Sequence, residues 1–95
     1  MVQVGQIVIS KAGRDKGLPF LVVSVKDKYL LLCDGKTRLA VKPKQKKEIH
    51  VQKTNTVYSC IAVNIESYKQ SGTLDCKVRK AIAMFKKETQ KPCET

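Results

Sequence analysis

Three short apolar runs separated by turn residues constrain the fold of this chain more than any other feature. The runs cover residues 7–9, 18–25 and 29–33. Aspartate and glycine follow the third run as Asp34-Gly35, which is a strong hairpin signal. Short aliphatic runs at this spacing predict antiparallel strands. Because the edges of a small sheet are free to pair with other chains, we expect the sheet to close into a barrel or to be covered.

Two further strands are predicted after these, over residues 37–41 and 48–52. Residues 43–47 read as a loop between them, and Ile49 points inward in the last strand while His50 points outward. The 18–25 strand carries apolar residues on both of its faces, which indicates that it is covered on two sides. The sequence therefore predicts five strands, one of which also contacts a helix.

The hydrophobic periodicity changes from strand to helix after Lys53. A first helix is marked by Val57, Ile61, Ile65 and Tyr68. We predict that Thr54, Asn55 or Thr56 caps the start of this helix and that Gly72 ends it. A second helix is marked by Leu74, Val78, Ala81, Ile82 and Phe85, with Thr73 as its N-cap and Pro92 beyond its end. We expect both apolar stripes to pack on the sheet and on each other, with a protein-binding groove as the alternative interpretation.

The net charge restricts the choice of partner. The 95 residues include 19 Lys and Arg against 8 Asp and Glu, which gives +11. Residues 1–56 carry 12 basic and 4 acidic side chains, a difference of +8, whereas residues 57–95 carry 7 and 4, a difference of +3. A surplus this large favours a polyanionic partner, either nucleic acid or an anionic membrane. Because most of it lies on the predicted sheet, we expect the sheet to form the contact.

Two basic segments are the candidates for that contact. The segment over residues 11–17 is bounded by Gly13 and Gly17 around Arg14-Asp15-Lys16, and residues 42–47 contain four lysines beside the single acid Glu48. Glycines allow a backbone to turn tightly or to approach a ligand closely, and both interpretations stay open. The lysine run is either a solvated surface or a phosphate contact.

These residues carry a family resemblance. The pattern Val-Gly-Gln-Ile-Val-Ile-Ser-Lys-Ala-Gly-Arg-Asp-Lys-Gly, followed by a strand and by Leu-Leu-Leu-Cys-Asp-Gly, resembles the KOW motif of ribosomal and transcription-elongation proteins. With the segment Glu-Ile-His-Val-Gln-Lys-Thr-Asn and the two helical patterns, the chain is similar to short KOW-domain proteins of Gram-positive bacteria that look like the eukaryotic-type large-subunit ribosomal protein fourteen. The resemblance spans nearly the whole chain and implies an SH3-like barrel and RNA binding.

The fold expected from both lines of argument is mainly β with a C-terminal α part. It comprises an SH3-like five-stranded KOW barrel over residues 1–54, two short helices over 55–88 and a flexible tail over 89–95. The predicted RNA-binding residues are Lys11, Arg14, Lys16, Gly17, Lys36, Arg38, Lys42, Lys44, Lys46 and Lys47. The first four are predicted from the resemblance to the KOW motif. The others are predicted from their charge and from the alternation of side chains along a strand.

Other chemistries lack their usual residues. The four cysteines form no C-x-x-C pair, and His50 is the only histidine, so we expect no metal and no cofactor. The acids are scattered singly, which argues against an enzyme and a small-molecule substrate. No charged leader precedes an apolar segment and no run approaches ~18 apolar residues, so we expect a cytoplasmic protein with reduced thiols and no membrane contact.

The expected function is therefore non-enzymatic binding of structured RNA through backbone phosphates. The resemblance implies large-subunit ribosomal RNA, a ribosome-associated location and a role in translation, with ribosomal proteins as further partners. Lysine outnumbers arginine 16 to 3, which favours phosphate contacts over base reading. Of five aromatic residues, the patterns assign most to the core, so they give little support to base stacking. The alternative is an SH3-like module that docks on proteins of the transcription or translation machinery.

Overall fold

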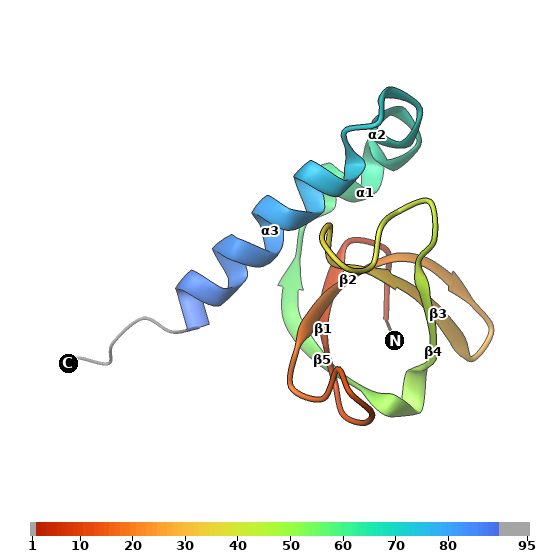
Figure 1. Cartoon of the computed structure of the whole chain (residues 1–95), viewed down its shortest axis with the longest axis vertical. Helices are drawn as coiled ribbons and strands as arrows, with labels where there is room; N and C mark the ends of the chain where they lie inside the picture. The colour runs from red at the N-terminus through yellow and green to blue at the C-terminus, as the bar shows by residue number, and fades with distance from the viewer. Residues whose placement is uncertain (1, 90–95) are drawn as a thin grey trace.

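The computed structural model describes residues 2–89, which form a curved antiparallel sheet with helices on its outer side (Figure 1). The strands are β1 (Gln6–Ser10), β2 (Pro19–Lys26), β3 (Tyr29–Cys33), β4 (Lys44–Lys47) and β5 (Val51–Val57). Their order in the sheet is β4-β3-β2-β1-β5, and the 3-10 turn η1 (Glu48–His50) joins the two edge strands. Within residues 2–89 this sheet is not closed by pairing of β4 with β5, so the predicted closed barrel is not confirmed.

Strand β2 is covered on both faces, as its sequence predicts. Its Leu21 pairs with Cys33, and its Val22 pairs with Leu32. One buried cluster fills the inside of the curved sheet and contains Val2, Val8, Phe20, Val22, Leu30, Leu32 and Val51. The other lies between the sheet and the helices and contains Ile7, Leu21, Val23, Cys33, Ile61, Leu74, Val78, Ala81, Ile82 and Phe85. Period-two alternation thus divides β2 between two cores.

The fourth strand lies later in the chain than the sequence pattern predicts. Residues 37–41, predicted as a strand, form bends and turns, and the strand is Lys44–Lys47 within the predicted loop. The carboxylate of Asp34 accepts hydrogen bonds from the N–H groups of Lys36 and Arg38, at 2.9 and 2.8 Å, and from the Thr37 hydroxyl at 2.9 Å. These bonds fold the segment after β3 into a tight loop. Pairing of β4 along the edge of β3 then outweighs the low strand propensity of lysine.

The fifth strand is also displaced along the chain. Residues 48–50 form η1, so Ile49, which was predicted to point inward, is 71% exposed. Strand β5 extends to Val57, which was predicted to begin the helical stripe. The Thr54 hydroxyl donates to the carbonyl oxygen of Ile7 at 2.7 Å, where the register of β1 against β5 shifts. The residues predicted as helix caps are therefore part of the sheet.

Three helices follow the sheet instead of two. They are α1 (Ser59–Val63), α2 (Ile65–Ser71) and α3 (Leu74–Thr89). The first predicted helix is interrupted at Asn64, whose φ of −108° and ψ of 14° are not helical. Gly72 ends α2 with a φ of 76°, as predicted, and α3 buries the predicted stripe against the sheet. Pro92 and residues 90–95 of the predicted tail lie outside the described residues. None of the helices described here combines the length and apolar character needed to cross a membrane.

Candidate nucleic-acid interface

The basic loop, residues 11–17, connects β1 to β2 and is folded by its own main chain. Gly13 and Gly17 have φ angles of 79° and 86°, which favour glycine. The N–H group of Gly17 donates to the Ser10 carbonyl at 2.8 Å, and that of Leu18 donates to the Asp15 carbonyl at 2.9 Å. Because these amides have internal partners, the loop presents its basic side chains rather than those N–H groups. The glycines thus permit the turn.

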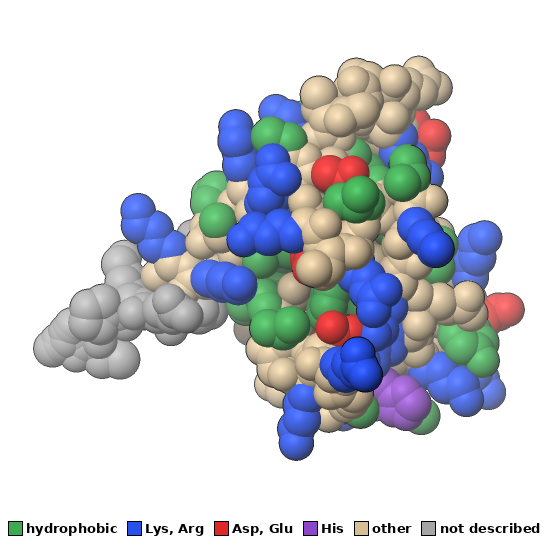
Figure 2. All heavy atoms as spheres, viewed as in Figure 1, with side chains coloured by type: hydrophobic (Ala, Val, Ile, Leu, Met, Phe, Trp, Pro, Cys, Tyr) green, Lys and Arg blue, Asp and Glu red, His purple; other side chains and the backbone are tan. Residues whose placement is uncertain are grey.

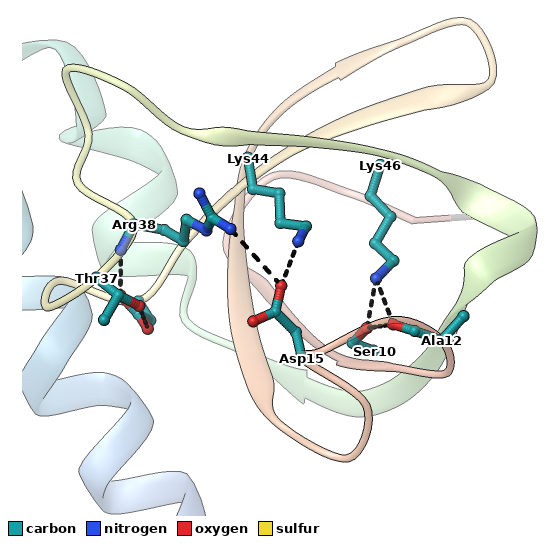
Figure 3. Close-up of polar contacts among 8 residues, drawn as sticks. Ser10, Ala12, Asp15, Thr37, Arg38, Lys44 and Lys46 are labelled. Atoms are coloured by element: carbon teal, nitrogen blue, oxygen red, sulfur yellow. Dashed lines mark hydrogen bonds and ion pairs between the residues drawn. The ribbon is translucent and has the colours of Figure 1, made fainter.

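Asp15 holds two of the predicted cationic residues against this loop (Figure 3). Its carboxylate pairs with the ammonium group of Lys44, and Nη2 of Arg38 lies 4.0 Å away. The side chain of Asp15 is only 16% exposed. The hydrogen bond from Lys44, aided by the positive charges of Lys44, Arg38 and Lys46, lowers the pKa of Asp15 below its ordinary value of 3.8 despite partial burial. Asp15 is therefore a charged anchor for β4.

Lys46 makes a second bridge from β4 to the same region. Its Nζ donates to the Ser10 hydroxyl at 2.6 Å and to the Ala12 carbonyl at 2.9 Å. Figure 3 shows Lys44 and Lys46 pointing the same way across the gap between β4 and the basic loop, as residues two apart on a strand must. Side-chain contacts therefore connect β4 to the β1–β2 segment, whereas in the sheet the main chain of β4 pairs with β3.

The remaining predicted cationic residues are exposed to solvent. They are Lys11, Arg14, Lys16, Lys36, Lys42 and Lys47. Figure 2 shows Lys and Arg side chains across the sheet and along α3, with few Asp and Glu between them. The predicted set is thus divided: Lys44, Lys46 and Arg38 contact groups of this chain, while six cations and Gly17 of the basic loop face outward.

The segment after β3 places Lys36 beside α3. The Ala40 N–H donates to the carboxylate of Asp75 at 2.7 Å, and Nη1 of Arg79 donates to the Gly35 carbonyl at 3.1 Å. Hydrogen bonds to the Asp34 carboxylate from the backbone of Arg38 and Lys36 offset its desolvation and lower its pKa. A shallow pocket here is lined by Leu18, Pro19, Asp34, Lys36, Arg79, Ile82, Ala83 and Lys86. Arg79 and Lys86 were omitted from the predicted site, although the sequence places both off the apolar stripe.

A larger groove lies at the opposite end of β3 from this pocket. The Tyr29 groove has a volume of about 800 Å³ and is lined by Lys11, Lys28, Tyr29, Lys47, Glu48, Ile49, Val51 and Lys53. The Glu48 N–H donates to the Lys28 carbonyl at 2.8 Å, and the Lys11 N–H donates to the His50 carbonyl at 2.9 Å. These two bonds fasten η1 to the β2–β3 turn and to the basic loop.

The Tyr29 groove combines cations with an exposed aromatic ring. Tyr29 is 40% exposed, and the Nζ of Lys47 lies 6.0 Å from its ring centre. Glu48 is the acid of the lining, and its carboxylate lies 3.7 Å from Lys53. Sequence reasoning missed Lys28, Tyr29 and Lys53 because the first two are distant in the chain from the third and from the other residues of the groove. The two-residue turn at Asp27-Lys28 was the available signal, since it puts Lys28 and Tyr29 at one end of the β2–β3 hairpin.

No metal site is found among the described residues, and the Cys33 thiol is buried. No group of three His, Cys, Asp or Glu side chains in residues 2–89 is arranged to hold a metal ion. Cys33, Cys60 and Cys76 are free thiols, and burial raises the pKa of Cys33 to about 12. Cys33 is therefore a protonated core residue at neutral pH.

Comparison with known proteins does not assign this chain to a family. No protein-family model matches the sequence, and no curated protein matches it.

Proposed function

We propose that this protein binds structured RNA through phosphate contacts and has no enzymatic activity. The observation that carries the proposal is the set of exposed cations around the sheet: Lys11, Arg14, Lys16, Lys36, Lys42 and Lys47. Even if every acid of the chain neutralised one base, 19 minus 8 would leave 11 positive charges. Such a surface attracts a polyanion over a distance of about one Debye length.

The proposed fold is an SH3-like barrel of the KOW type. Its support is the strand order β4-β3-β2-β1-β5, with a single 3-10 turn between the edge strands. The contacts of Lys44 and Lys46 with the β1–β2 segment bring the two sides of the curved sheet together. With the KOW-like sequence of the basic loop, this arrangement favours a ribosomal or ribosome-associated protein in the cytoplasm, with large-subunit ribosomal RNA as its partner.

Lysine chemistry indicates how the RNA is recognised. An ammonium group contacts a phosphate as a point charge, without the fixed bidentate geometry of a guanidinium group. Since 16 of the 19 basic residues are lysines, recognition depends on the positions of phosphates along a folded RNA. In this proposal Arg14 and Lys16 at the tip of the basic loop make the central contacts, with Gly17 setting the turn that presents them.

Crosslinking of the full chain to RNA in cells of its source, followed by sequencing of the attached fragments, tests the proposal. We expect a sharp peak on large-subunit ribosomal RNA. A broad distribution over transcripts would remove the ribosomal assignment, and no RNA above background would remove RNA binding itself. The ratio of protein to purified large subunits then separates a permanent ribosomal component, near one to one, from a transient assembly factor.

Docking on another protein is the second candidate function. The observation that favours it is the side chain of Val41, which is 88% exposed and lines a pocket of about 200 Å³ with Ala40 and Tyr68. A protein partner held there would stay bound after nuclease treatment and at high salt, because apolar contacts are not weakened by salt. Loss of the partner under those conditions would support the RNA proposal instead.

A further inference from the structure

We propose that the Tyr29 groove takes one unpaired nucleotide of the RNA, with its base on the Tyr29 ring and its phosphates on the surrounding lysines. This inference rests on the proposed function and deepens it by naming the class of RNA. The preferred ligand is a folded RNA that carries a bulged or looped-out nucleotide next to a helix, rather than a continuous duplex.

The charge of the lining selects a polyanion. Four lysines and one glutamate line the groove, which leaves a surplus of three positive charges. The carboxylate of Glu48 lies 3.7 Å from the Lys53 ammonium, so its charge is directed at a cation on one side of the groove. The other three lysines of the lining are Lys11 in the basic loop, Lys28 in the β2–β3 turn and Lys47 in β4. Each of these ammonium groups can contact a phosphate as a point charge.

The apolar part of the lining suits a flat base. Tyr29 is 40% exposed at the start of β3, and Ile49 is 71% exposed on η1 beside it. An aromatic ring and an aliphatic side chain that leave one groove open offer the two apolar surfaces between which a base can lie. A paired base is already stacked within its duplex, so only an unpaired nucleotide can enter. The basic loop has no such combination, because its exposed side chains are charged except for Ala12.

The walls of the groove are fixed before any ligand binds. Tyr29 pairs with Lys47 in the β3–β4 ladder, and the N–H of Glu48 donates to the Lys28 carbonyl at 2.8 Å. Lys11 is attached through its N–H to the His50 carbonyl at 2.9 Å. Preformed walls reduce the ordering entropy that binding costs. The groove is therefore suited to a specific nucleotide position on the RNA.

Two RNA hairpins of equal phosphate number test the proposal, one with a single-nucleotide bulge and one fully paired. We expect the full chain to bind the bulged hairpin more tightly. Tyr29→Ala should lower affinity for the bulged hairpin by about 5- to 100-fold, to the level of the paired one, because stacking contributes in that range per base. Tyr29→Phe should keep the preference, since the ring remains. Circular dichroism of each variant confirms that the fold is retained.

A fluorescent reporter gives a second test that does not depend on losing a contact. The chain has no tryptophan, so Tyr29→Trp introduces a single indole at the groove. We expect its fluorescence to be quenched by the bulged hairpin and little changed by the paired one. Phe20→Trp is unsuitable as a control because Phe20 is buried, whereas Tyr68→Trp places an indole on α2, away from the groove, and should respond to neither hairpin.

The outcomes separate this inference from the proposed function. If both hairpins bind equally and Tyr29→Ala weakens neither, RNA binding stands and the Tyr29 groove is not its nucleotide site. If neither hairpin binds the native chain at 50 mM salt, the proposed RNA-binding function itself is wrong, and the inference about the groove falls with it. A polyglutamate peptide provides the last comparison. If it displaces the bulged hairpin and quenches the indole introduced by Tyr29→Trp as strongly as that hairpin does, the groove takes acidic protein segments and the inference is wrong.

Discussion

Asp15 is the residue on which the basic loop and strand β4 depend together. Its carboxylate contacts Lys44 and lies 4.0 Å from Arg38, and these contacts lower its pKa below 3.8. Without that acid, the loop would place Arg14 and Lys16 beside three more cations of the same chain. Asp15 therefore reduces repulsion inside the proposed interface while leaving the loop's own basic side chains exposed.

We expect Asp15→Asn to lower the free energy of unfolding by about 0.5 to 1 kcal/mol at pH 7, the range for a partly exposed ion pair. Because the folded-state pKa is lowered, the stabilisation is complete above the ordinary pKa of 3.8 and is lost as pH falls through the folded value. Urea denaturation of both proteins at pH 7 and pH 2.5 measures this, and the difference should shrink at the lower pH. Asp27→Asn, in the exposed β2–β3 turn, is the control, and a difference that persists at pH 2.5 would exclude the charge effect.

A second residue, Gly35, lies where the loop after β3 packs closely against α3. It has a φ of 79°, and a Cβ there would lie 3.0 Å from the Cβ and the N of Arg79 and would meet the Asp75 carbonyl oxygen. Gly17 has a similar φ of 86°, but no atom lies within 4 Å of the place where its Cβ would be. The two glycines thus share one conformational requirement and differ in their contact with a helix.

We expect Gly17→Ala to cost about 1 kcal/mol of stability, from the left-handed conformation alone. Gly35→Ala should cost about 1 to 3 kcal/mol more, because α3 must move away from the loop. Thermal unfolding of both variants measures the difference. Equal costs would mean that the loop and α3 are not in close contact in solution.

At the scale of the element, α3 completes the outer core of the sheet. It buries Leu74, Val78 and Phe85 against the face of the sheet that carries Ile7 and Leu21. Strand β2 is therefore covered on its outer side only when α3 is docked. The helices are part of the folded unit and not an appendage of it.

We expect Leu74→Ala to lower the free energy of unfolding by about 2 to 5 kcal/mol, since the side chain is 2% exposed and its removal leaves a cavity. Met84→Ala, on the same helix but 53% exposed, should change it by less than about 0.5 kcal/mol. Denaturant titrations give both values. Similar small effects at the two positions would show that α3 is not packed on the sheet.

At the scale of the whole molecule, the positive charge predicts a strong salt dependence of RNA binding. If the interface contacts roughly five to eight phosphates, the logarithm of the affinity should fall against the logarithm of salt with a slope of about −4 to −7. Arg14→Gln combined with Lys16→Gln should flatten that slope by about 1.5. Lys69→Gln combined with Lys80→Gln removes the same charge from the helices and should leave it nearly unchanged. Equal slopes for both double variants would remove the basic loop from the interface.

Much of the fold could be predicted from local patterns, and the failures have a common cause. The first three strands, the turn at Asp27-Lys28, the two-sided β2 and the stripe of α3 all follow from apolar periodicity. The fourth strand was missed because alternating Leu39 and Val41 look like strand residues, while lysines in 44–47 look like a loop. Leu39 and Val41 are exposed, and residues 44–47 pair with β3, because hydrogen bonds to Asp34 and Asp75 hold the preceding residues in a loop.

The candidate site was only partly visible in the sequence for a similar reason. Charge counts locate the cations, and the glycine spacing locates the basic loop. Which cations are exposed depends on partners distant in the chain: Asp15 is 29 residues from Lys44, and Ser10 is 36 residues from Lys46. The Tyr29 groove likewise brings together three distant stretches of the chain, at residues 11, 28–29 and 47–53.

The sequence by itself determined the classes of element, the two-core character of β2 and the excess of positive charge, because periodicity and composition are local properties of the chain. The tertiary structure decided where the fourth and fifth strands begin, and it shows no pairing of β4 with β5 within residues 2–89. It decided which lysines contact acids and which face solvent. It also decided that Tyr29 lies exposed among lysines. These outcomes depend on hydrogen bonds and ion pairs between residues far apart in the chain, which no local pattern specifies.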